Sequence, residues 1–136
     1  MNEFIIPWSK TVEVPITSVT VGGFLQFPIN LDDLNNAQIC GFEVISATEL
    51  TTAPSGATVF AAADIPKVAI TLALENGSVK KLDTIPAYCA NRRLNYGSYF
   101  VTSKFKWNPS SSKINIMASG LTAAQSIIVV FYYIPQ

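Results

Sequence analysis

A run of eight consecutive apolar residues, from Ile127 to Ile134, lies close to the end of the chain. The run is rich in β-branched and aromatic residues, so it predicts a β-strand. Successive side chains of a strand point to opposite faces of its sheet, and a half-exposed strand therefore alternates apolar and polar residues. This run does not alternate, so both of its faces require cover. One face belongs to the core. The other, either Ile128, Val130, Tyr132 and Ile134 or the alternate set, needs loops of the chain or a neighbouring subunit.

Charged residues are scarce in this chain. They make up 13% of its 136 residues, against about 25% in a typical soluble domain, whereas hydrophobic residues make up 49%. The length fits one domain with its own core. Nine basic and nine acidic residues cancel, so no basic excess is present to bind a phosphate backbone, and we expect no nucleic-acid partner. The shortage of charge favours a packed oligomer.

Prolines and glycines are spread along the chain and separate short apolar or alternating runs, which is typical of an all-β protein. About eight such runs predict strands, at residues 10–16, 24–29, 39–47, 67–74, 79–85, 99–107, 113–118 and 125–134. Asn76 and Gly77 join two of them and predict a type I′ hairpin, because both residues tolerate positive φ angles. Residues 48–58 predict a polar loop, and Pro86 begins a short predicted helix over residues 86–93.

Most connections between these strands are long, which favours Greek-key crossings over a simple meander. We therefore predict an all-β fold, an antiparallel two-sheet sandwich of about eight strands with jelly-roll topology. An immunoglobulin-like sandwich is the second choice. It usually has a Trp between two paired cysteines, and no Trp lies between Cys40 and Cys89. The predicted organisation is an N-terminal arm, residues 1–8, followed by a single β-sandwich domain, residues 9–136.

The residue types that carry most enzyme chemistry are missing or scattered. The chain has no histidine, which excludes histidine-based triads, cysteine–histidine dyads and histidine metal sites. Its two cysteines are too few for a structural zinc site, and their apolar surroundings predict free buried thiols. The spacing of Asp32, Asp33, Asp64 and Asp83 does not indicate a calcium site or an acid pair. We expect a protein that is not an enzyme and that holds neither a metal nor a cofactor.

The N-terminal arm is predominantly apolar, and Pro7 prevents its regular pairing with a sheet. We expect the arm to dock on a neighbouring subunit. It has no basic n-region and its apolar stretch is too short for a signal peptide. No segment approaches 18 apolar residues, so we expect no membrane-spanning helix. The candidate interface comprises the arm and the outer face of the closing run, namely Phe4, Ile5, Ile6, Trp8, Ile128, Val130 and Tyr132.

The order of about eight strands, the Asn76–Gly77 hairpin and the closing segment 125–133 carry a family resemblance. In this pattern the chain resembles the small single-jelly-roll virion proteins of icosahedral bacteriophages, that is, capsid, penton or minor capsid proteins. The resemblance implies a homo-oligomer that contacts other virion structural proteins. It implies assembly in the host cytoplasm and location in the virion, and it supplies no catalytic residues.

A carbohydrate-binding module, or a receptor-binding domain of a phage fibre, is the alternative interpretation. Exposed aromatic rings stack on sugars, and the ligand candidates in this chain are Trp107, Tyr96 and Tyr99. Trp107 ends a predicted strand beside a polar turn, a position that lectins use for sugar binding. Exposure of Trp107 or Trp8 in a concave patch would support this interpretation, and tight packing of both would exclude it.

Overall fold

The computed structural model describes residues 8–28, 34, 37–76, 78–91, 99–100 and 105–134, with the backbone alone at 99–100. This part of the chain is all-β, which confirms the predicted class, and its helical segments are three short 3₁₀ helices. The strands are β1 (Trp8–Pro15), β2 (Phe24–Gln26), β3 (Gln38–Ile45), β4 (Val68–Asn76), β5 (Val79–Pro86), β6 (Tyr99–Phe100), β7 (Lys106–Trp107), β8 (Lys113–Ile116) and β9 (Ser126–Ile134). The 3₁₀ helices are η1 (Ala62–Lys67), η2 (Ala87–Ala90) and η3 (Pro109–Ser111).

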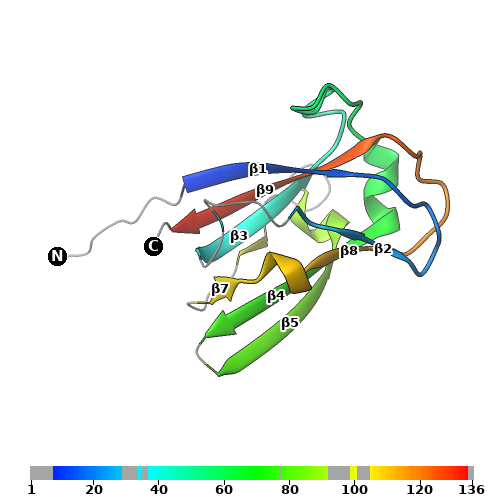
Figure 1. Cartoon of the computed structure of the whole chain (residues 1–136). Coiled ribbons are helices and arrows are strands. Elements are labelled where there is room, and N and C mark those ends of the chain that lie inside the picture. The colour runs from blue at the N-terminus through cyan, green and yellow to red at the C-terminus, as the bar shows by residue number, and fades with distance from the viewer. Residues whose placement is uncertain are drawn as a thin grey trace.

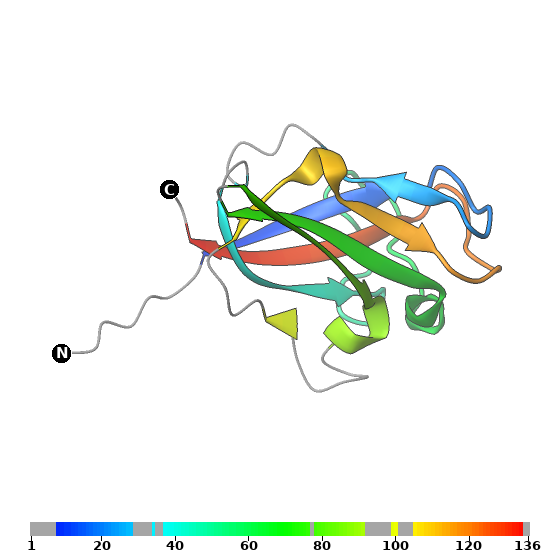
Figure 2. The same ribbon diagram turned by 90° about the horizontal axis from the view of Figure 1, so that it is seen from below.

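All described strands belong to one curled antiparallel sheet with two limbs (Figures 1 and 2). The β9 limb contains β1, β9, β3 and β6, and the β4 limb contains β2, β8, β4 and β5. The two-residue strand β7 connects the limbs, because Lys106 pairs with Gln38 of β3 while Trp107 pairs with Leu74 of β4. The sheet therefore folds over on itself and encloses the core between its limbs.

The core is built from the alternate residues of each strand that point between the limbs. In β9 the inward residues are Ile127, Val129, Phe131 and Tyr133, and in β4 they are Val68, Ile70, Leu72 and Leu74. Three aromatic rings lie at the centre. The ring centroid of Trp107 is 4.5 Å from that of Phe131 and 5.5 Å from that of Phe27. Edge-to-face and tilted ring pairs of this kind stabilise a core beyond the area that they bury.

Several predicted boundaries change in the structure. The hairpin between β4 and β5 is confirmed, but Asn76 pairs with Val79, so only residues 77–78 connect the strands. Asn76 remains in the ladder, and Ala124 is the only described non-glycine residue with a positive φ. The strand expected at 99–107 is represented by β6 and β7. The helix expected over 86–93 is represented by the shorter η2, because Pro86 ends β5, and β1 begins at Trp8, inside the predicted arm.

The polar loop predicted at 48–58 begins with an ordered turn. Ser46 lies three residues before Glu49, the spacing of a capping box. Carboxylate oxygen Oε2 of Glu49 accepts hydrogen bonds from the backbone N–H and the hydroxyl of Ser46, at 3.2 and 2.7 Å. The amide Nδ2 of Asn91 donates to Glu49 Oε1 at 3.0 Å and to the carbonyl oxygen of Val44 at 2.9 Å. The turn is thereby attached to β3 and to the residue after η2.

Within the described residues, no helix combines the length and the apolar character needed to cross a membrane.

Candidate assembly surfaces

The outer face of β9 is covered by the chain itself at the start of the strand. Ile128 is completely buried and pairs with Glu13 of β1 and Ile45 of β3. The connection that follows β3 passes beside it: the N–H of Ser126 donates to the carbonyl of Thr58, and Ser126 accepts from the N–H of Phe60, both at 2.9 Å. The expectation that a second subunit covers Ile128 is therefore not supported, because the subunit's own connection lies there.

Polar contacts hold this connection in place. Carboxylate Glu13 accepts hydrogen bonds from the N–H of Ser55 at 3.0 Å, from the hydroxyl of Ser55, and from the hydroxyl of Ser126 at 2.7 Å. Burial alone raises the pKa of the Glu13 carboxyl, but these hydrogen bonds outweigh burial and hold the pKa below its usual value. The charged carboxylate thus ties the loop to β1.

The outer face of β9 is only half covered toward the end of the strand. Val130 and Tyr132 are both half-buried. Val130 lies between Thr11 of β1 and Glu43 of β3. The hydroxyl of Tyr132 donates a hydrogen bond to Oε2 of Glu43 at 3.3 Å. These two interface candidates remain partly accessible in the isolated subunit.

Trp8 is the one residue of the predicted arm interface that the structure describes, and it is exposed. Its side chain has an exposed fraction of 63%, and its ring meets Tyr133 edge to face with centroids 6.3 Å apart. Among the described strands, β1 pairs with β9 alone and forms one edge of the sheet. The other arm candidates, Phe4, Ile5 and Ile6, lie outside the described residues. A large aromatic side chain is therefore accessible at the end of the molecule where β1 begins.

A second apolar surface, which we call the β2 patch, lies at the opposite end and consists of Val21, Phe24 and Met117. Phe24 is 53% exposed and Met117 is 60% exposed. Hydrogen bonds hold the two segments together: the N–H of Gly22 donates to the carbonyl of Ile116 at 2.9 Å, and the N–H of Ile116 donates to the carbonyl of Gly23 at 3.0 Å. The patch was not predicted from the sequence, because it depends on the pairing of β2 with β8.

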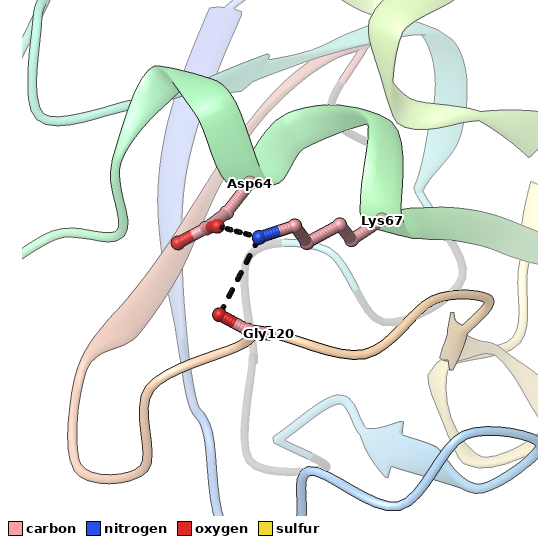
Figure 3. A network of polar contacts seen from close by, with 3 residues as sticks. All are labelled: Asp64, Lys67 and Gly120. Carbon is pink, nitrogen blue, oxygen red and sulfur yellow. Dashed lines mark hydrogen bonds and ion pairs between the residues drawn. The ribbon is translucent and has the colours of Figure 1, made fainter.

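Lys67 holds the segment that carries Met117 against η1, and Figure 3 shows the contacts of its side chain. In η1, Lys67 Nζ lies 2.6 Å from Oδ1 of Asp64 and 3.4 Å from the carbonyl oxygen of Gly120. The backbone carbonyl of Lys67 accepts a hydrogen bond from the N–H of Met117 at 2.8 Å. Asp64 therefore has a structural partner, and Asp83 pairs separately with Lys81 at 3.1 Å. The two carboxylates do not form an acid pair with each other.

The ligand candidates of the carbohydrate-binding interpretation do not form an exposed platform in the described residues. Trp107 is only 2% exposed, and its indole N–H donates to the hydroxyl of Ser112 at 2.8 Å. Its ring faces cannot stack on a sugar, because they pack in the core. Tyr96 lies outside the described residues, and for Tyr99 the backbone alone is described. The pocket between the β4–β5 hairpin and η3, about 210 Å³, is lined by residues such as Lys80, Leu82 and Ser111, with no aromatic side chain.

Cysteine and carboxylate chemistry gives no separate site in the described part of the chain. Cys40 and Cys89 are half-buried and form no disulfide, and burial raises the pKa of the Cys40 thiol. Cys40 is the extra residue at a bulge, since Ile39 pairs with Tyr133 and Gly41 pairs with Tyr132. No group of three or more metal-ligating side chains occurs among the described residues.

No protein-family model matches the sequence, and neither a characterised protein nor a solved structure matches the chain. The accessible surfaces described above are consequently the basis for a functional proposal.

Proposed function

We propose that the chain is a non-enzymatic structural subunit that assembles with copies of itself, and that its fold is a jelly roll. The pairing of the described strands supports this topology. The strands form nested antiparallel pairs: β1 with β9, β2 with β8, β3 with β6, and β4 with β5. Such nesting describes one long ribbon, and rolling it brings β9 beside β3 and β8 beside β4. A rolled ribbon of this kind is the arrangement of a jelly roll.

The observation that carries the assembly proposal is the exposure of large apolar side chains at both ends of the fold. Trp8 marks one end, and Phe24 and Met117 mark the other. Single exposed apolar residues are ordinary, but contiguous ones indicate interaction surfaces. Only 13% of the residues are charged, so few charges are present to keep copies of the chain apart.

A virion is the setting that we propose for this assembly. Jelly-roll domains are frequent in viral shells, and the pattern of strands resembles small jelly-roll virion proteins. In this proposal the subunit forms a capsid or vertex oligomer, contacts other virion structural proteins, and is assembled in the cytoplasm of the host. The protein acts through its surfaces, and the half-buried Val130 and Tyr132 lie on a further face that neighbours can cover.

Mass measurement in solution tests the assembly proposal. Light scattering coupled to size-exclusion chromatography should give a multiple of the 14.7 kDa chain mass. The variant Trp8→Ser should shift the distribution toward the monomer, whereas Leu82→Ser, which changes a residue that is 69% exposed on β5, serves as the matched control. A monomer at millimolar concentration would contradict assembly. Mass spectrometry of purified particles tests the virion setting separately, since a structural subunit must be present there in many copies.

A further inference from the structure

We infer that the β2 patch receives the N-terminal segment, residues 1–7, of a second copy of this chain, an inference that rests on the proposed assembly function. The patch and the segment suit each other chemically. The patch presents Val21, Phe24 and Met117 to solvent, and the segment contributes Phe4, Ile5 and Ile6. Joining two accessible apolar surfaces removes both from water, which is the main driving force of association.

The segment cannot reach the patch of its own copy. Strand β1 is eight residues long, which is about 26 Å at ~3.3 Å per residue. The loop that joins β1 to β2, which carries Val21 and leads to Phe24, begins at the far end of β1, where Pro15 pairs with Ser126. Figure 2 shows this loop at the end of the fold away from the N-terminus. Phe4 precedes Trp8 by four residues, a span of at most about 14 Å. A segment that fills the patch must therefore come from another molecule.

Charge and backbone hydrogen bonding add selectivity to this contact. The ammonium group of Lys113 lies 4.9 Å from the centroid of the Phe24 ring, at the rim of the patch. Among the described residues, no carboxylate forms an ion pair with Lys113. The segment carries one acidic side chain, Glu3, directly before Phe4. Strand β2 pairs with β8 alone among the described strands, so its other edge can accept an extended segment as an added strand.

A mixing experiment tests the inference with full-length chains. Segment variant Phe4→Asp/Ile5→Asp keeps an intact patch, and patch variant Phe24→Asp/Met117→Asp keeps an intact segment. Each variant alone should lose self-association by at least about ten-fold in Kd, because charge is placed in an apolar contact. An equimolar mixture should recover one contact and give a species of twice the 14.7 kDa chain mass. The control Leu82→Asp, at an exposed position outside the patch, should associate within about two-fold of wild type.

A charge exchange provides a second readout. Glu3→Lys and Lys113→Glu should each weaken association, and mixing the two single variants should restore it, since one contact then has opposite charges again. Unchanged melting temperatures of all variants confirm that the fold is intact.

The outcomes separate this inference from the function on which it rests. A monomeric wild-type chain would overturn both. An oligomer that neither double variant affects would overturn the segment–patch contact and leave assembly standing. Loss of association in the patch variant alone, or a mixture that fails to recover, would assign the patch to an occupant other than the N-terminal segment.

Discussion

Removal of a single buried hydroxyl, that of Ser112, should destabilise the fold strongly. Ser112 is fully buried, and its Oγ accepts two hydrogen bonds: from the indole Nε1 of Trp107 at 2.8 Å and from the backbone N–H of Ala73 at 2.9 Å. It also donates one to the carbonyl oxygen of Asn108 at 2.8 Å. The hydroxyl therefore satisfies two donors that have no access to water. In Ser112→Ala, both donors lose their acceptor.

The expected magnitude follows from these two orphaned donors. Leaving one buried donor unsatisfied costs about 1–3 kcal/mol, so two should lower the free energy of unfolding by about 2–5 kcal/mol after partial relaxation. For a chain of this length that corresponds to a fall in Tm of roughly 8–20 °C. The matched control is Ser110→Ala. Its hydroxyl is exposed and, within the described part of the chain, bonds the side chain of Asn108 alone, so its removal should change stability by no more than about 0.5 kcal/mol.

Urea denaturation followed by circular dichroism measures both variants, and a double-mutant cycle with Trp107→Phe isolates the indole contact. In the Phe background one orphaned donor is already absent, so Ser112→Ala should cost less, with a coupling energy of about 1–2 kcal/mol. A loss of unfolding free energy below about 1 kcal/mol for Ser112→Ala, or no coupling to Trp107, would refute the reasoning that this hydroxyl satisfies the buried donors beside β7.

Three further variants test two backbone positions with positive φ and the carboxylate of Glu49. Gly120 has φ +110°, and an added Cβ would lie 2.7 Å from Lys67 Nζ, so Gly120→Ala should destabilise by about 1–3 kcal/mol in thermal unfolding. The counterpart Ala124→Gly relieves a φ of 70°. Its stability should be within about 0.5 kcal/mol of wild type, since relief of strain offsets the added entropy of the unfolded state. A larger loss of stability for Ala124→Gly than for Gly120→Ala would contradict the geometry. Burial raises the pKa of the Glu49 carboxyl, but hydrogen bonds from Ser46 and Asn91 outweigh burial, so the pKa lies below its usual 4.5. A pKa that is lowered in the folded state contributes to the free energy of unfolding above pH 4.5. This contribution is lost as the pH falls through the folded-state pKa. The stability difference between wild type and Glu49→Gln should therefore be constant above pH 4.5 and shrink in acid; a difference independent of pH would show that the hydrogen bonds do not depend on the charge.

Local pattern predicted the strands well because alternation is a property of a few consecutive residues. The run 125–134 became β9 (Ser126–Ile134), and the Asn76–Gly77 pair marked the hairpin between β4 and β5. Partners distant in sequence were not predictable in this way. Trp107 ends a short strand beside a polar turn, which suggested an exposed ring, but Ser112 in that turn supplies the acceptor that allows the indole to be buried.

The inability of local patterns to show distant partners also explains why the accessible surfaces were not predicted correctly. Ile128 belongs to the outer face of β9 as predicted, and alternation cannot show that the connection after β3 returns to cover it. The β2 patch arises because Phe24 pairs with Asn115, a residue 91 positions later in the chain. The capping-box spacing of Ser46 and Glu49, by contrast, was present in the sequence and could have identified the ordered turn before the structure did.

The continuous apolar character of β9 therefore has two causes of different kinds. Its inward residues pack in the core, and the first part of its outer face is covered by the subunit's own connection, which leaves Val130 and Tyr132 half-buried. Large apolar side chains are accessible at the two ends of the fold, at Trp8 and at the β2 patch, and also on β5 at Leu82. These ends differ in composition, so a contact between them joins unlike surfaces. Two antiparallel copies can exchange this contact reciprocally, each segment on the patch of the other copy, which gives a two-fold dimer, whereas head-to-tail repetition gives a closed ring or an open filament. Assembly through these ends accordingly predicts that Phe24→Asp/Met117→Asp dissociates the oligomer whatever its symmetry, and an oligomer that withstands this change would point to the face of β9 instead.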